Sequence, residues 1–215
     1  MVAALDRLRA LPEVFSLRRV MATFDEPDVR RATRIASVYL DRWVRDGLVQ
    51  AYGGRTGVYF NLIRNPQAPS QRRDEALRLV FPSAVLAGAS VLHDAGVTTQ
   101  IPHRIEVAVL RRKSYPNLPE LELLPRPQAW FEAMRPYVLF QDGVGLPRLL
   151  PAAALADCWH RHGSSQTMWR PGADDLYAEE VDWRTFDHVL RDLGDPWPRG
   201  YEAFRPGSAR HKMTA

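Results

Sequence analysis

Residues 29–47 read VRRATRIASVYLDRWVRDG, and the fold that we expect for the first third of the chain follows from this stretch. Apolar residues recur at helical spacing and gather on one side of a helix drawn through residues 29–46. They are Ala32, Ile35, Ala36, Tyr39, Leu40 and Trp43. The acids just before Val29 suit a helix N-terminus, and Gly47 is a residue type that commonly follows a helix C-terminus. The pattern therefore predicts an amphipathic helix over residues 29–46.

Two shorter helices precede this helix and a hairpin follows it. Residues 2–11 are amphipathic and stop at Pro12, and Ser16 is a suitable N-cap for a helix over residues 17–23. Residues 48–52 and 57–63 are rich in β-formers, and Gly53-Gly54-Arg55 between them predicts a hairpin tip. Two short helices, a long helix and a hairpin follow the order of a winged helix-turn-helix, which we expect over residues 1–64.

The polar face of the long helix carries arginines, whose forked donors suit guanine and phosphate. Asp41 would repel phosphate, so we expect the groove contact to end near Ser37 and Arg45 to pair with Asp41. An ordinary amphipathic helix with a solvated basic face is the alternative. The predicted DNA-binding residues are Arg18, Arg19, Arg30, Arg31, Arg34, Ser37, Gly54, Arg55 and Thr56.

Formal charge is distributed unevenly along the chain. Residues 1–64 contain 11 arginines and seven acids, whereas residues 65–215 contain 18 basic and 18 acidic residues. The whole excess of +4 therefore lies in the first third of the chain. A local basic excess favours a polyanionic partner, although a solvated surface would account for so small a charge.

The remainder of the chain predicts a second, α+β domain with a small sheet and flanking helices. We expect a polar linker over residues 65–75, this domain over residues 76–204, and a loose tail over residues 205–215. Expected helices cover residues 84–95, 128–134, 152–162 and 183–193, and expected strands cover residues 104–110, 121–124 and 137–140.

Three motifs resemble a known family. The first comprises Phe15-Ser16-Leu17-Arg18, Trp43-Val44-Arg45-Asp46-Gly47-Leu48-Val49 and Gly57-Val58-Tyr59. The second is SVLHDAGVTTQIP at residues 90–102, which leads into a β-rich stretch, and the third is PAAALAD at residues 151–157. In this order they resemble AbiEi-type antitoxins, the transcriptional regulators of type IV abortive-infection toxin–antitoxin systems.

This resemblance implies a sequence-specific double-stranded DNA-binding protein that represses its own operon and neutralises a nucleotidyltransferase toxin encoded beside it. The family is described as neutralising without a stable complex with the toxin. A plain repressor without a toxin partner, or a DNA-associated nuclease-like enzyme of a defence or repair system, remains the alternative.

The sequence favours a protein that is not an enzyme. Neither a phosphate-binding loop nor a serine nucleophile elbow is complete, and the acids Glu106 and Glu122 lack the following lysine of a magnesium nuclease. Cys158 and His162 stand one helical turn apart, but tetrahedral zinc requires four ligands, so we expect no metal and no cofactor.

The same sequence predicts a cytoplasmic protein without a membrane partner. It has one cysteine and no apolar stretch long enough to span a membrane, and charged residues interrupt its N-terminal segment.

Overall fold

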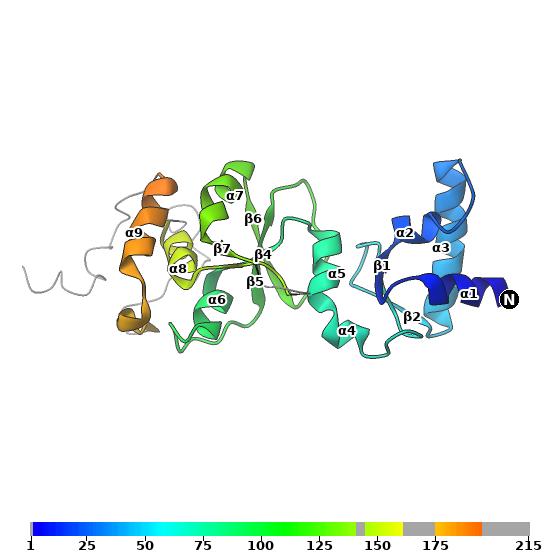
Figure 1. The fold of residues 1–215 in the computed structure, drawn as a ribbon, viewed down its shortest axis with the longest axis horizontal. Coiled ribbons are helices and arrows are strands. Elements are labelled where there is room, and N and C mark those ends of the chain that lie inside the picture. The colour runs from blue at the N-terminus through cyan, green and yellow to red at the C-terminus, as the bar shows by residue number, and fades with distance from the viewer. Residues whose placement is uncertain (1, 141–144, 161–174, 195–215) are drawn as a thin grey trace, which may run out of the picture. The chain divides into compact units, whose positions relative to one another are not determined.

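The computed structural model describes residues 2–140, 145–160 and 175–194, and over these residues the fold is α+β, as predicted (Figure 1). The chain divides into two compact units, each described here by itself. The first unit comprises Met1–Ser83, Lys113–Leu118 and Asp142–Leu146. The second comprises Ala84–Arg112, Pro119–Gln141 and Pro147–Ala215.

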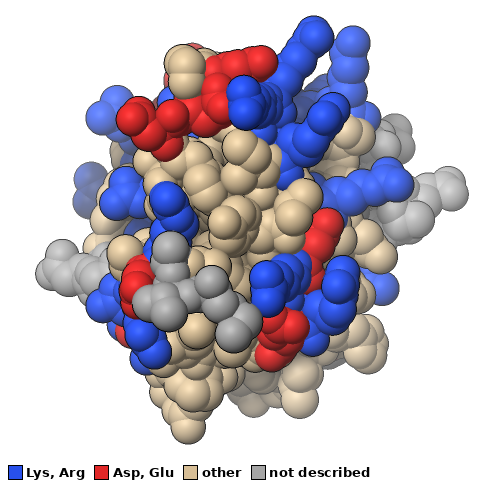
Figure 2. All heavy atoms as spheres, turned by 90° about the vertical axis from the view of Figure 1, so that its right-hand side faces the viewer, with Lys and Arg blue, Asp and Glu red and all other residues tan. Residues whose placement is uncertain are grey.

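The first unit begins with α1 (Val2–Ala10), α2 (Leu17–Met21) and α3 (Val29–Arg45). Ser16 caps α2 by accepting a hydrogen bond from the backbone N–H of Arg19. Asp28 caps α3 in the same way, with its Oδ1 2.8 Å from the N of Arg30. Gly47 follows α3 with a φ of 69°, a left-handed conformation that glycine adopts readily. Figure 2 views the end of this unit that carries α1 and α3.

A three-stranded antiparallel sheet in the order β1-β3-β2 packs with these helices. Its strands are β1 (Val14–Ser16), β2 (Val49–Ala51) and β3 (Val58–Asn61), so the predicted hairpin is joined by a strand that the sequence pattern did not indicate. Buried Asn61 donates hydrogen bonds to the carbonyls of Leu8 and Leu11, at 2.8 and 3.2 Å, and so ties β3 to the end of α1.

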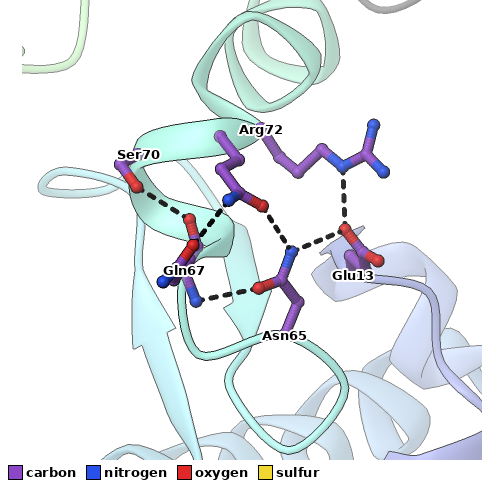
Figure 3. Close-up of polar contacts among 6 residues, drawn as sticks. Glu13, Asn65, Gln67, Ser70 and Arg72 are labelled. Carbon is purple, nitrogen blue, oxygen red and sulfur yellow. Dashed lines mark hydrogen bonds and ion pairs between the residues drawn. The ribbon is translucent and has the colours of Figure 1, made fainter.

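The expected linker over residues 65–75 is wrong, because these residues belong to the first unit and are largely helical. They form α4 (Ala68–Gln71) and the start of α5 (Arg73–Val80), which packs against β1 and β3. Figure 3 shows the polar contacts at this point: the Nε of Arg72 lies 2.8 Å from the Oε2 of Glu13, and Asn65 donates to the same oxygen at 3.2 Å. The apolar residues Ala76 and Leu77 are buried, and the removal of their side chains from water stabilises the packing of α5 on the sheet.

The second unit contains a five-stranded mixed sheet in the order β6-β5-β4-β8-β7. Its strands are β4 (Val85–Leu86), β5 (Ile105–Leu110), β6 (Leu121–Arg126), β7 (Val138–Leu139) and β8 (Arg148–Leu149). The longest ladder joins β5 and β6, which run parallel from the pair Ile105–Leu121 to the pair Leu110–Arg126. The start of the expected helix over residues 84–95 is therefore wrong, since Val85 and Leu86 are sheet residues.

Helices complete the second unit: α6 (Gly88–Asp94), α7 (Gln128–Met134), α8 (Pro151–His160) and α9 (Trp183–Asp192), with short 3₁₀ turns η1 (Arg135–Tyr137) and η4 (Ala178–Glu180). Helix α8 is buried from Ala152 to Trp159 and lies in the main apolar cluster together with Phe186 and Leu190 of α9. The end of the expected helix at His162 and the expected tail over residues 205–215 lie outside the described residues.

Candidate nucleic-acid interface

Helix α3 has a buried face and an exposed face. Ala36, Leu40 and Trp43 are at most 2% exposed and pack in the core of the first unit. The ring of Tyr39 adds aromatic contacts: it is tilted against Phe24, with 5.2 Å between the ring centroids, and edge-on to Trp43, with 5.7 Å. The predicted apolar side of this helix is thus the side that holds it against the rest of the unit.

The exposed face carries the predicted arginines, and their surroundings differ. Arg31 pairs with Glu26, with 3.1 Å between Nε and Oε2. Arg30 and Arg34 are exposed, and neither has an ion-pair partner among the described residues. These two guanidinium groups, together with that of exposed Arg45 at the C-terminal end of α3, are therefore available to an external anion.

The expected ion pair between Arg45 and Asp41 is not formed. Arg42 pairs instead with Asp46, the residue that follows α3, with 3.7 Å between Nε and Oδ2. This pair also follows the i, i+4 spacing, and both side chains are about half exposed, so its contribution to stability is small.

Arg18 and Arg19 are exposed on α2, which packs against α3. The hydroxyl of Thr33 on α3 lies 3.5 Å from the sulfur of Met21 on α2, which marks the contact between the two helices. Figure 2 shows basic side chains around a central uncharged area at this end of the unit, with acidic side chains above this area and also among the basic ones beside and below it. The two arginines of α2 thus lie on the surface of the first unit, as Arg30 and Arg34 of α3 do.

Val38 is an exposed residue of α3 that the sequence analysis did not single out. Its side chain is 62% exposed, on the same helix as half-buried Ser37 and exposed Arg34. An apolar residue that breaks the polar face of an amphipathic helix is the signal that could have indicated it. Val38 gives this face an apolar contact surface between its polar groups.

The β2–β3 hairpin tip has a left-handed backbone at three residues. Gly53 and Gly57 have positive φ values of 67° and 68°, and Arg55 has a φ of 61°, whereas Gly54 is not in the left-handed region. The hydroxyl of Thr56 donates to the carbonyl of Tyr52 at 2.5 Å and accepts from the N–H of Val58 at 3.2 Å. Thr56 therefore shapes the turn, while Gly54 and Arg55 are exposed.

A distant segment lies against this tip, and no local sequence signal indicates it. Gly54 forms an isolated antiparallel bridge with Asn117, in the connection between β5 and β6. A Cβ atom added at Gly53 would lie 2.4 Å from a methyl carbon of Leu118. The predicted residues Gly54 and Arg55 are thus next to Asn117 in the structure.

Other kinds of site have less support in the part of the chain that the structure describes. No group of three or more His, Cys, Asp or Glu residues there could hold a metal ion. Cys158 is buried on α8, and His162, one helical turn further along the sequence, lies outside the described residues. No described helix is both long enough and apolar enough to cross a bilayer.

Comparison with known proteins adds little to this geometry. No protein-family model and no curated protein matches the sequence. Among solved structures, the chain is similar to the crystal structure of RV2827C protein from Mycobacterium tuberculosis, with 19% identity and a TM-score of 0.42. The match covers 90% of this chain and 76% of that one. A likeness at this TM-score carries no argument about function.

Proposed function

We propose that residues 1–64 form a winged helix-turn-helix and that the protein is a sequence-specific double-stranded DNA-binding transcriptional regulator. The observation that carries this proposal is the division of α3 into two faces. Leu40 and Trp43 fix the helix in the core, while Arg30 and Arg34 are exposed and have no ion-pair partner among the described residues.

The chemistry of the exposed face suits the major groove, which is wide enough to admit an α-helix. Arg30 and Arg34 would donate to guanine edges or to phosphate, and Ser37 would donate to or accept from a base. Val38, which is 62% exposed, would contact thymine methyl groups. A face that combines charged, polar and apolar groups favours base recognition over simple attraction to phosphate.

The β2–β3 hairpin would serve as the wing. Arg55 is exposed at its tip, where a single guanidinium would contact a phosphate or the neighbouring minor groove. Arg18 and Arg19, exposed on α2, would add phosphate contacts. These contacts would position the protein on DNA, and α3 would select the sequence.

We further propose that the protein acts as the antitoxin and autorepressor of a toxin–antitoxin operon. This narrower role rests on a resemblance to AbiEi-type antitoxins at residues 15–18, 43–49, 57–59, 90–102 and 151–157. The second unit would then carry the neutralising function. Co-expression with the product of the adjacent reading frame tests it, because growth rescue is expected if that product is a nucleotidyltransferase toxin. Lack of rescue would leave a plain repressor.

Selection from a pool of random-sequence duplex DNA tests the DNA-binding proposal. We expect the full-length protein to enrich a defined sequence and to lose that enrichment when Arg30 and Arg34 are both replaced by alanine. Arg42→Ala is the matched control, because Arg42 lies on the same helix and pairs with Asp46. If the wild-type protein enriches no sequence, the proposal is wrong.

A further inference from the structure

The connection between β5 and β6 contributes a segment to the first unit. Lys113–Leu118 belongs to that unit, whereas β5 and β6 on either side belong to the second. Because β5 and β6 are parallel, the chain must run back from the end of β5 to the level at which β5 began before β6 can start. The connection is therefore too long for a tight turn, and part of it is available to pack elsewhere.

Three contacts hold this segment in the first unit. Asn117 forms the antiparallel bridge with Gly54. Leu118 is 4% exposed and lies against Gly53, where an added Cβ would meet its methyl carbon at 2.4 Å and the carbonyl oxygen of Asn117 at 3.2 Å. The ring centroids of Tyr115 and Phe81 lie 6.3 Å apart. The segment is thus packed onto the hairpin tip rather than passing near it.

The polar end of the segment is exposed. Lys113 and Ser114 are both exposed, and Lys113 has no ion-pair partner in the described part of the chain. Four residues span at most about 14 Å, so the chain keeps Lys113 within that distance of Asn117, which bridges Gly54 at the hairpin tip. A lysine ammonium is a flexible point charge, which suits contact with phosphate rather than recognition of a base.

We propose that Lys113 contacts the DNA backbone beside Arg55, so that the DNA-binding surface includes a segment remote in sequence from the helix-turn-helix. The inference rests on the proposed function. The Gly54–Asn117 bridge positions Lys113, and Leu118 keeps the bridge in place. The partner of Lys113 is a phosphate of duplex DNA, and its contribution to binding is independent of base sequence.

The test is a salt titration of full-length protein with a mixed-sequence DNA duplex. A lost phosphate contact lowers the slope of log affinity against log salt by about 1. We therefore expect the affinity ratio of wild type to Lys113→Ala to shrink about threefold between roughly 50 and 200 mM salt. Lys113→Arg should restore the wild-type slope, and Arg184→Ala, which removes an exposed cation on α9, should leave it unchanged.

A second measurement uses the rarity of lysine, since Lys113 and Lys212 are the only lysines in the sequence. Acetylation of the protein with and without the duplex, followed by mass spectrometry, reports on Lys113 directly. We expect DNA to slow the acetylation of Lys113.

An unchanged salt slope in Lys113→Ala, or unchanged acetylation of Lys113, overturns this inference. If Arg30→Ala/Arg34→Ala still abolishes sequence selection in the same preparation, the proposed function stands without the contribution of Lys113. If the wild-type protein has no salt-dependent affinity for DNA, both proposals fail.

Discussion

Asp157 on α8 and Arg126 at the end of β6 form a buried ion pair, with 3.0 Å between Oδ2 and Nη2 and side-chain exposures of 0% and 11%. The indole of Trp130 donates to the other carboxylate oxygen of Asp157 at 2.8 Å. A buried carboxylate requires such partners because water cannot solvate it. Together these contacts join α7, α8 and the edge strand β6 of the sheet.

Removing one partner of this pair should destabilise the protein. We expect Asp157→Ala to lower the free energy of unfolding by about 3–5 kcal/mol, because Arg126 would keep its charge in a buried site. Urea denaturation measures the loss. The control is Asp94→Ala, whose partner Arg148 lies 3.6 Å away and whose side chain is 55% exposed, so we expect a loss below about 1 kcal/mol. Equal losses in the two variants would contradict the role given to burial.

Asn61 should be important to the first unit although it is polar. It is fully buried and donates to two carbonyls near the end of α1. Asn61→Leu keeps the side-chain size and removes both bonds, so we expect a loss of about 1–3 kcal/mol in urea denaturation. Gln50→Leu, at an exposed position of the neighbouring strand β2, should change stability much less. A neutral Asn61→Leu variant would show that these bonds do not stabilise the unit.

The contact between Glu13 and Arg72 should make stability depend on pH in the acidic range. Glu13 accepts hydrogen bonds from Arg72 and from Asn65 (Figure 3). Both lower the pKa of Glu13 in the folded protein, and the bond from Arg72 has the larger effect. Stabilisation from a lowered carboxyl pKa is present above the unfolded value, about 4.3, and is lost as pH falls through the folded value. We expect the difference in urea midpoint between wild type and Glu13→Gln to shrink as pH falls through this range. A difference that grows toward acid pH would contradict this sign.

Base contacts by α3 should be measurable in free energy once a preferred DNA sequence is known. We expect Arg30→Ala and Arg34→Ala each to weaken binding to that sequence by about 1–3 kcal/mol if the arginine contacts a base. A phosphate contact would instead weaken binding to all sequences alike and reduce the salt dependence. Fluorescence anisotropy with preferred and scrambled duplexes separates the two. Unchanged binding in both folded variants would remove this face from the interface.

The first unit should require α5 for its stability. Ala76, Leu77 and Phe81 are at most 3% exposed, and a fragment that ends at residue 70 lacks all three. We expect the fragment of residues 1–83 to unfold at a higher urea concentration than the fragment of residues 1–70, because it buries more apolar surface. Equal urea midpoints for the two fragments would show that α5 does not stabilise the first unit, as expected if residues 65–75 were a simple linker.

Local sequence signals were sufficient for most helices of the described residues. Helix α3 was predicted to within a residue, because its apolar spacing, the cap at Asp28 and the glycine at position 47 all act within a few residues of one another. The division of α3 into a core face and an arginine face follows from the same periodicity, so the central candidate residues Arg30 and Arg34 could be named from sequence alone.

The short strands β1, β4 and β8 could not be predicted in this way. Strand β1 pairs with β3 more than 40 residues later in the chain, with Val14 opposite Phe60, and Val85 and Leu86 of β4 pair with β5 and β8. Their hydrogen bonds come from distant partners, so a short apolar run carries no sign of whether it is a strand or part of a helix. The expected helix over residues 84–95 was wrong at its start for this reason.

The sequence by itself determined most of the helices, the basic excess of residues 1–64 and the two faces of α3, because each of these can be read from residues close together along the chain. Only the tertiary structure decided that residues 65–83 belong to the first unit and that Asn117 and Leu118 lie on the hairpin tip. Those contacts join residues far apart in sequence, and their partners are chosen by packing and by pairing of backbone groups across space rather than by local preference.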